Sequence, residues 1–171
     1  MPTLGLWYPK TLDFDLYSYS DADFGGCKID RKSTTGTCHF LGGCLISWFS
    51  KKQNSVALST TEAEYVAAGS CCAQVLWMKQ QLEDYGLIVC KIPIKCDNTS
   101  AINLSKNPVH HSRTKHIEIR HHFIRDHVLR GDVALEYVNT KERLADMIFT
   151  TPLDRDPFSK IRGELGLMEL P

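Results

Sequence analysis

Four acidic residues at widely separated positions form the part of this sequence best suited to chemistry. They are Asp21, Glu64, Asp97 and Asp146. Carboxylates are the protein ligands that Mg²⁺ prefers, and two such ions held about 3.5–4 Å apart hydrolyse phosphodiester bonds by activating water and stabilising the leaving oxygen. For any one of these acids alone, a helix cap or a solvated carboxylate is the simpler interpretation. A joint metal site therefore requires a fold that brings the four together.

Two of the four acids follow predicted strands. Residues 16–20 alternate apolar and polar side chains up to Asp21, and the glycine pair 25–26 then turns the chain. Residues 92–96 have the pattern of a short buried strand that ends at Asp97. Side chains at such strand ends project beyond the edge of a sheet, where the ligands of α/β proteins usually bind. The two aspartates are therefore expected at one edge.

Turn signals and periodicity predict the other strands and helices. Gly42 and Gly43 separate two apolar runs, residues 35–41 and 45–49, as in a β-hairpin, and residues 56–58 predict a further short strand. The longest predicted helix begins at a capping hydroxyl within residues 59–61 and ends at Tyr85, ahead of Gly86. Further predictions are helices over 100–105, 117–130 and 157–165, a strand over 133–138, and a helix from Thr140 that carries Asp146. This order predicts an α/β sandwich, with a mixed sheet covered by helices.

Length and composition limit the class of protein. The 171 residues, 43% of them hydrophobic, are enough for one substantial core, and no apolar run is as long as a membrane span. The formal charge is zero, so binding of nucleic acid has to be local or assisted, because it depends on Lys and Arg. Seven cysteines without repeated Cys-x-x-Cys pairs predict reduced thiols packed mostly in the core. The start lacks the pattern of a signal peptide, so we expect a cytoplasmic or nuclear protein.

Short motifs around the acids resemble those of one family, in order and over nearly the whole chain. They are Tyr19–Phe24 (YSDADF), Asp30–Gly36 (DRKSTTG), Ile46–Trp48 (ISW), Ser50–Gln53 (SKKQ), Leu58–Tyr65 (LSTTEAEY), Cys96–Ile102 (CDNTSAI), His111–Ile117 (HSRTKHI) and Leu144–Asp146 (LAD). This set closely resembles the ribonuclease H domain of copia-type LTR retrotransposon polyproteins. Many motifs in sequence are far more specific than any single short pattern.

The resemblance implies a ribonuclease H-like fold, with a mixed five-stranded sheet flanked by helices, over residues 16–153. Residues 1–15 are then an extension from the preceding polyprotein region, and residues 154–171 a tail with a helix. The implied activity is cleavage of the RNA strand of RNA/DNA hybrids with two Mg²⁺ ions, or Mn²⁺ as a substitute, during reverse transcription. The implied partner is a reverse transcriptase domain that precedes this one in the same polyprotein. Such a protein is expected in the cytoplasm, including virus-like particles, or in the nucleus.

The resemblance also assigns roles to the four acids, two of which have rivals. Asp21 is implied to bridge both ions, with Glu64 and Asp97 on one ion and Asp146 on the other. Glu62 lies two residues from Glu64 on the same helix, so only one of the two readily faces the metals, and the AEYVA context favours Glu64. Asp23 would share the face of Asp21 if the strand continued, and it is the reserve choice.

Basic residues and histidines near the motifs are candidates for contacts with the hybrid. The candidates for backbone contacts are Arg31, Lys32, Lys51, Lys52, Arg113 and Lys115, and His111 and His116 are candidates for positioning the hybrid. A zinc site is an alternative use of the histidines at 110–127. The pairs His111/His116 and His122/His127 lack the i, i+4 interval of zinc-binding helices, so structural or surface roles are favoured.

The sequence also departs from the family. Cellular relatives commonly carry a histidine in the loop before the last catalytic acid, whereas residues 139–143 contain none. Phe24 and Thr151 stand where tryptophan and lysine are more usual. The alternative function is therefore a decayed or domesticated module of the same fold, which binds nucleic acid or a protein partner without catalysis.

Overall fold

The computed structural model describes residues 3–10, 13–106, 123–139 and 155–169. Its strands are β1 (Leu4–Leu6), β2 (Leu16–Ala22), β3 (Thr34–Leu41), β4 (Cys44–Lys52), β5 (Ile92–Cys96), β6 (Val133–Tyr137) and β7 (Leu167–Glu169). Its helices are α1 (Thr60–Asp84), α2 (Thr99–Lys106), α3 (Phe123–Arg130) and α5 (Arg155–Glu164). In these described parts of the chain, no helix is long and apolar enough to cross a membrane.

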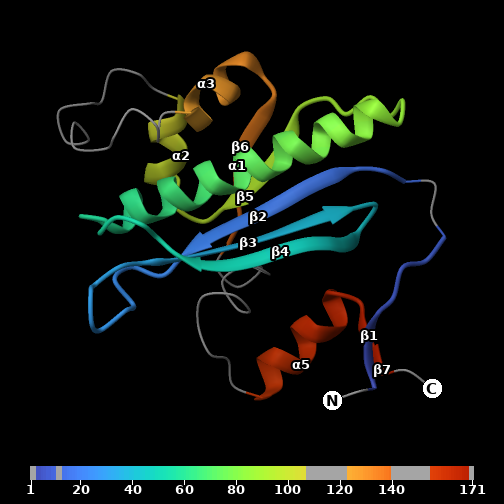
Figure 1. Ribbon diagram of the computed structural model, residues 1–171, viewed down its shortest axis with the longest axis horizontal. Helices are drawn as coiled ribbons and strands as arrows, with labels where there is room; N and C mark the ends of the chain where they lie inside the picture. Colours follow the sequence, from blue (N-terminus) through green and yellow to red (C-terminus); the bar gives the residue numbers. More distant parts are fainter. Residues whose placement is uncertain (1–2, 11–12, 107–122, 140–154, 170–171) are drawn as a thin grey trace.

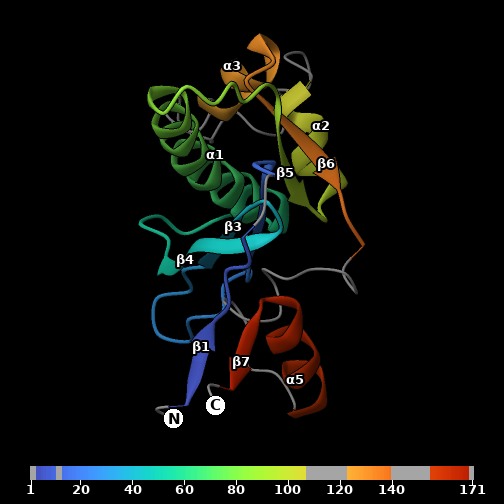
Figure 2. The same ribbon diagram turned by 90° about the vertical axis from the view of Figure 1, so that its right-hand side faces the viewer.

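Five strands form the central mixed sheet, in the order β4-β3-β2-β5-β6. Strands β2, β3 and β4 form an antiparallel meander, and β5 and β6 add in parallel to β2. Helices α1, α2 and α3 lie on one face of the sheet, and α5 lies on the other side together with the small β1-β7 sheet (Figures 1 and 2). The α/β class and the mixed five-stranded sheet expected from the sequence are confirmed.

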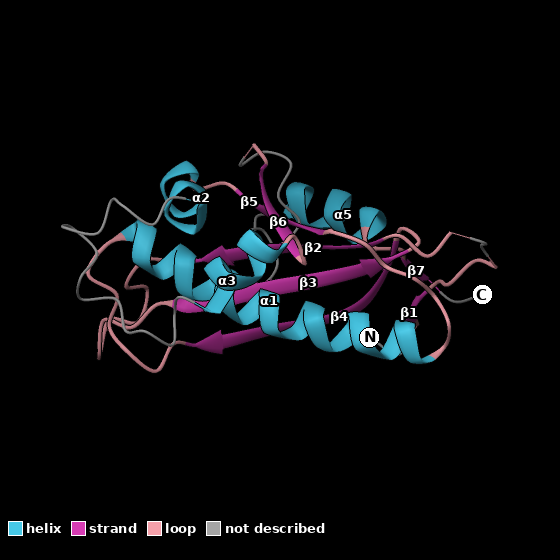
Figure 3. Cartoon of the chain, turned by 90° about the horizontal axis from the view of Figure 1, so that it is seen from above, coloured by secondary structure: helices cyan, strands magenta, loops and turns pink. Residues whose placement is uncertain are grey.

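The β3-β4 hairpin and helix α1 follow their local signals. Gly42 and Gly43 have φ angles of 55° and 77°, a conformation that favours glycine and closes the hairpin as predicted. Helix α1 begins after Ser59, whose hydroxyl accepts a hydrogen bond from the backbone N–H of Glu62, and it ends ahead of Gly86, at φ 79°. It lies lengthwise over β2 and β3 (Figure 3).

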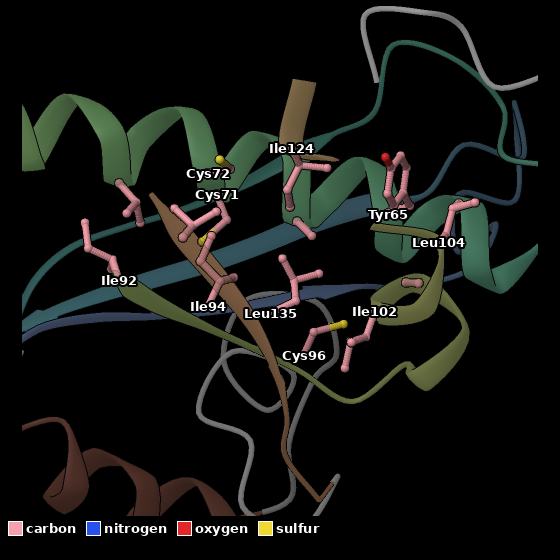
Figure 4. Packing of buried hydrophobic residues seen from close by; sticks show 14 of the residues in the cluster. Tyr65, Cys71, Cys72, Ile92, Ile94, Cys96, Ile102, Leu104, Ile124 and Leu135 are labelled. Carbon is pink, nitrogen blue, oxygen red and sulfur yellow. The ribbon is translucent and has the colours of Figure 1, made fainter. Parts of the chain in front are cut away.

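Two apolar clusters hold the two faces of the sheet. The larger joins α1, α2 and α3 to β5 and β6, with Tyr65, Cys72, Ile94 and Leu135 among its fully or nearly fully buried members (Figure 4). The second lies on the opposite face, and its members are Tyr19, Cys38, Phe40, Leu45, Val138, Ile161 and Leu165. The last two belong to α5 and the turn after it, so the tail covers this face. Four cysteines are buried and all seven are free, as expected.

One predicted strand is absent from the described residues, and two predicted helices lie partly or wholly outside them. Residues 56–58 form no strand, and the prediction of a third strand piece is wrong: Val56 and Leu58 are exposed, and the backbone N–H of Leu58 is instead used at the start of α1. Helix α3 is described from Phe123 onward, so the first part of the helix predicted over 117–130 lies outside the described residues. The predicted helix from Thr140 lies outside them as well.

Candidate metal-binding site

Strands β2 and β5 run side by side and bring two of the predicted acids to their ends. In the parallel register, Ser18 pairs with Ile94 and Tyr19 with Lys95. Asp21 lies two residues beyond the last of these pairs in β2, and Asp97 directly follows the end of β5. Asp21 pairs with Gly36 of β3 and is 2% exposed, and β2 runs one residue beyond it, to Ala22. The two aspartates thus lie at the carboxyl edge of the sheet, as the sequence predicted.

Helix α1 gives its two glutamates different surroundings. The carboxylate of Glu62 accepts a hydrogen bond from the backbone N–H of Leu58 at 2.7 Å, while Ser59 caps the backbone N–H of Glu62 at 3.2 Å. This pair of bonds is a variant of the capping box in which the carboxylate reaches the residue before the cap, so Glu62 stabilises the start of the helix. Glu64 is also buried, but its carboxylate faces the end of β5, where the thiol of Cys96 donates to its Oε2 atom at 3.8 Å.

Glu64 and Asp97 meet at the end of β5, together with a thiol that sequence reasoning had not assigned to the site. The ligand atoms of Glu64, Cys96 and Asp97 all lie within 4.8 Å of one another. Asn98 follows directly and caps α2, because its side chain accepts the backbone N–H of Ala101 at 2.9 Å. The turn between β5 and α2 is thereby fixed, which holds Asp97 beside Glu64. This arrangement provides hard oxygen donors for a divalent cation.

The reserve acid, Asp23, is used within its own loop. Its carboxylate accepts a hydrogen bond from the backbone N–H of Thr34, and its backbone N–H donates to the carbonyl of the same residue at 3.1 Å. Gly26 lies so close that a Cβ atom there would collide with the Asp23 carboxylate. Asp23 therefore ties the loop after β2 to the start of β3.

Several predicted site residues cannot be compared with the structure. Asp146, Arg113, Lys115 and His116 lie outside the described residues, as do the histidines at 110, 111, 121 and 122. The fourth acid and the positioning histidines therefore stay predictions.

Basic residues at the end of β4 share the edge of the sheet with the acids. Lys51 pairs with Thr35, which pairs with Ala22, so two strand spacings, about 10 Å, separate the backbone of Lys51 from that of β2 beside Asp21. Strands β2 and β4 both end where α1 begins (Figure 1). Lys51 and Lys52 also line a cavity of about 370 Å³ beside α1.

The two lysines differ in their partners. The ammonium of Lys52 lies 3.1 Å from a carboxylate oxygen of Asp30 and 3.2 Å from the sulfur of Cys27. Hydrogen bonds from Cys27 and then Lys52 lower the pKa of Asp30 to about 2. The charge of Lys52, at the end of β4, is thus offset by Asp30 in the loop between β2 and β3. Arg31, in the same loop, is exposed and adopts a positive φ of 57°, and Lys32 is half-buried.

Comparisons with known proteins place this arrangement in context. No protein-family model matches the chain. It is 40% identical over 171 residues to the retrovirus-related Pol polyprotein from transposon RE1 of Arabidopsis thaliana, a match that covers 99% of this chain and 12% of that protein. It is 42% identical over 152 residues to the corresponding polyprotein from transposon TNT 1-94 of Nicotiana tabacum, covering 89% of this chain and 11% of that one. The chain therefore spans about an eighth of the length of these relatives.

Solved structures show the same fold at low identity. The N-terminal RNase H domain of a Mycobacterium tuberculosis protein matches with a TM-score of 0.55 and 9% identity, covering 78% of this chain and 88% of that one. The prototype foamy virus protease-reverse transcriptase matches with a TM-score of 0.50 and 13% identity, covering 76% of this chain and 18% of that one. Both likenesses concern the fold, and the first confirms that it is the ribonuclease H fold.

Proposed function

We propose that this chain, which has the ribonuclease H fold and is homologous over nearly its whole length to a segment of copia-type, retrovirus-related Pol polyproteins, hydrolyses the RNA strand of RNA/DNA hybrids. The observation that carries the proposal is the meeting of Glu64 and Asp97 within 4.8 Å at the end of β5, next to the strand β2 whose end carries Asp21. The expected products carry 5′-phosphate and 3′-hydroxyl ends.

The donor atoms suit hard divalent cations. Asp21, Glu64 and Asp97 offer carboxylate oxygens, the ligands typical of Mg²⁺ and Mn²⁺. They come from β2, from α1 and from the residue that follows β5. Two ions bound there would supply activation of water and stabilisation of the leaving oxygen. We propose Asp146 as the fourth ligand on the strength of the sequence motif.

The chain's own residues would hold the hybrid over this edge. Lys51, exposed and about two strand spacings from β2, is suited to a phosphate contact, whereas the charge of Lys52 is offset by Asp30. Discrimination of the hybrid would rest on its shape and on the 2′-hydroxyls of the RNA strand. Because the net charge is zero, we further propose that a reverse transcriptase domain of the same polyprotein contributes to the grip on nucleic acid.

A cleavage assay with paired variants tests the proposal. A labelled RNA/DNA hybrid is incubated with the full chain in Mg²⁺ or Mn²⁺ at low salt, and cleavage of the RNA strand is expected. Asp97→Asn and Glu64→Gln, which each remove a ligand charge with little change in size, are expected to abolish cleavage. Glu62→Gln is the matched control, because it removes a charge from the same helix turn, where the carboxylate of Glu62 accepts a hydrogen bond from the backbone N–H of Leu58. It should retain cleavage.

The outcomes separate the two candidate functions. An uncut hybrid at high protein concentration in both metals contradicts the nuclease. Hybrid binding without metal-dependent turnover would favour the non-catalytic module instead. Loss of cleavage in Glu62→Gln but not in Glu64→Gln would reverse the assignment of the glutamates.

A further inference from the structure

Cys96 adds a soft donor to a site whose other donors are hard. Its sulfur lies 3.8 Å from Oε2 of Glu64, and the ligand atoms of both lie within 4.8 Å of that of Asp97. Cys96 is the last residue of β5 and is fully buried at the border of the larger core (Figure 4). Mg²⁺ makes no use of a thiol, whereas Zn²⁺ and Cd²⁺ bind thiolate sulfur strongly.

The observed separation fits a thiophilic ion. With sulfur at about 2.3 Å and a carboxylate oxygen at about 2.1 Å from one ion, the 3.8 Å between Sγ of Cys96 and Oε2 of Glu64 corresponds to an angle of about 119° at the ion. That is about 10° from the tetrahedral value that zinc prefers. Asp97 is half-buried, and its ligand atom lies within 4.8 Å of those of Glu64 and Cys96, so it supplies the third protein donor.

We propose that Glu64, Cys96 and Asp97 form a binding site for a thiophilic divalent ion, Zn²⁺ or Cd²⁺, and that this ion inhibits hydrolysis. On binding, the Cys96 thiol releases its proton to solvent and its sulfur donates an electron pair to the ion, while each carboxylate donates through one oxygen. Inhibition follows because the same two carboxylates are then withdrawn from the hard ions. Only the inhibitory effect rests on the proposed function; the binding does not.

Absorption spectroscopy on the folded chain tests the binding. The background is Cys27→Ser/Cys44→Ser/Cys90→Ser, which removes the three thiols that are not buried. Titration with Co²⁺ or Cd²⁺ is expected to give a thiolate-to-metal charge-transfer band that saturates at one equivalent. Cys96→Ala should abolish the band, and Cys96→Val, which fills the core better, guards against a folding failure. Cys72→Ala is the matched control, because Cys72 is buried in the same cluster but not among the three donors.

Carboxylate variants show whether the thiol acts within a site. In the same background, Glu64→Gln and Asp97→Asn are each expected to weaken Cd²⁺ binding by about 10–100-fold or more. Loss of a residue that only hydrogen-bonds to a metal ligand already weakens metal binding by that factor. The proposal is overturned by a band that never appears, by a band that survives removal of Cys96, or by a Cd²⁺ affinity that neither carboxylate variant changes.

The inhibitory effect is measured separately. In the presence of Mg²⁺, cleavage by the chain with Cys96 is expected to fall on addition of Zn²⁺. Relative to its own rate without Zn²⁺, Cys96→Val should need at least about tenfold more Zn²⁺ for the same inhibition. Equal sensitivity would overturn the inhibitory role. A charge-transfer band in a chain that never cleaves the hybrid would contradict the proposed function but support the thiophilic binding site. Cleavage of the hybrid without a charge-transfer band would support the proposed function but contradict the binding site.

Discussion

Acidification should destabilise the protein through one buried histidine. His39 lies on β3, under α1, with no exposed surface. Its Nδ1 atom is 2.7 Å from the hydroxyl of Ser18 on the neighbouring strand, and its Nε2 atom is 3.4 Å from that of Thr37. Burial lowers the pKa of His39 from 6.5 to about 4, because the charged ring would lose its hydration. The native state therefore requires the neutral ring.

The size and pH range of the effect follow from this difference. Above about pH 6.5 the ring is neutral in both folded and unfolded chains, and its contribution to stability is complete. As the pH falls below that value, the unfolded chain takes up a proton that the folded chain refuses until about pH 4. A difference of about 2.5 pH units, at about 1.4 kcal/mol each, is about 3.5 kcal/mol in full. About 3 kcal/mol of this is lost by about pH 4, where the folded chain itself begins to take up the proton. That is a large part of the 5–15 kcal/mol or so by which domains are stable.

Urea unfolding of the chain and of His39→Asn, followed from about pH 7.5 to about pH 4, measures this contribution. Asparagine keeps a polar atom near the position of Nδ1 but does not titrate. The other histidines and the carboxylates are present in both proteins, so their effects cancel in the comparison. The original chain should lose about 3 kcal/mol more than the variant over this range. Parallel loss of stability in the two proteins would refute the argument that His39 is held neutral.

Two further pairs of variants test the loop after β2 and the lysines at the end of β4. Gly26→Ala should lower the free energy of unfolding by about 1–3 kcal/mol, because the added Cβ would displace the carboxylate of Asp23. Gly69 lies in α1, and a Cβ atom added there would meet nothing within 4 Å, so Gly69→Ala should raise the free energy of unfolding by about 0.5–1 kcal/mol. Urea unfolding measures both variants. An equal change in the two would contradict the steric argument. Lys51→Gln should weaken hybrid binding and reduce its salt dependence by about one counterion, whereas Lys52→Gln should change that slope little because of its ion pair. Fluorescence anisotropy at several salt concentrations distinguishes them, and equal slopes would contradict the assignment.

Local signals predicted those elements whose boundaries depend on nearby residues. Helix α1 was predicted from a hydroxyl cap to Tyr85 because Ser59 and Gly86 act within one turn of the helix ends. The hairpin at Gly42 and Gly43 was predicted for the same reason. The segment 56–58 was misjudged because three apolar residues look alike in a strand and in a loop. Their exposure depends on the absence of a pairing strand in this part of the described chain, which periodicity does not reveal.

The site itself depends on contacts between distant parts of the sequence. Alternation along β5 puts Cys96 on the face of α1, within the larger core, and Asp97 follows where the strand has ended. The sequence predicts thiols packed mostly in the core, and nothing near Cys96 indicates that Glu64, 32 residues earlier, approaches its sulfur. The site straddles the end of β5 because α1 begins at this edge. Hard and soft donors thus meet between the start of α1 and the end of β5.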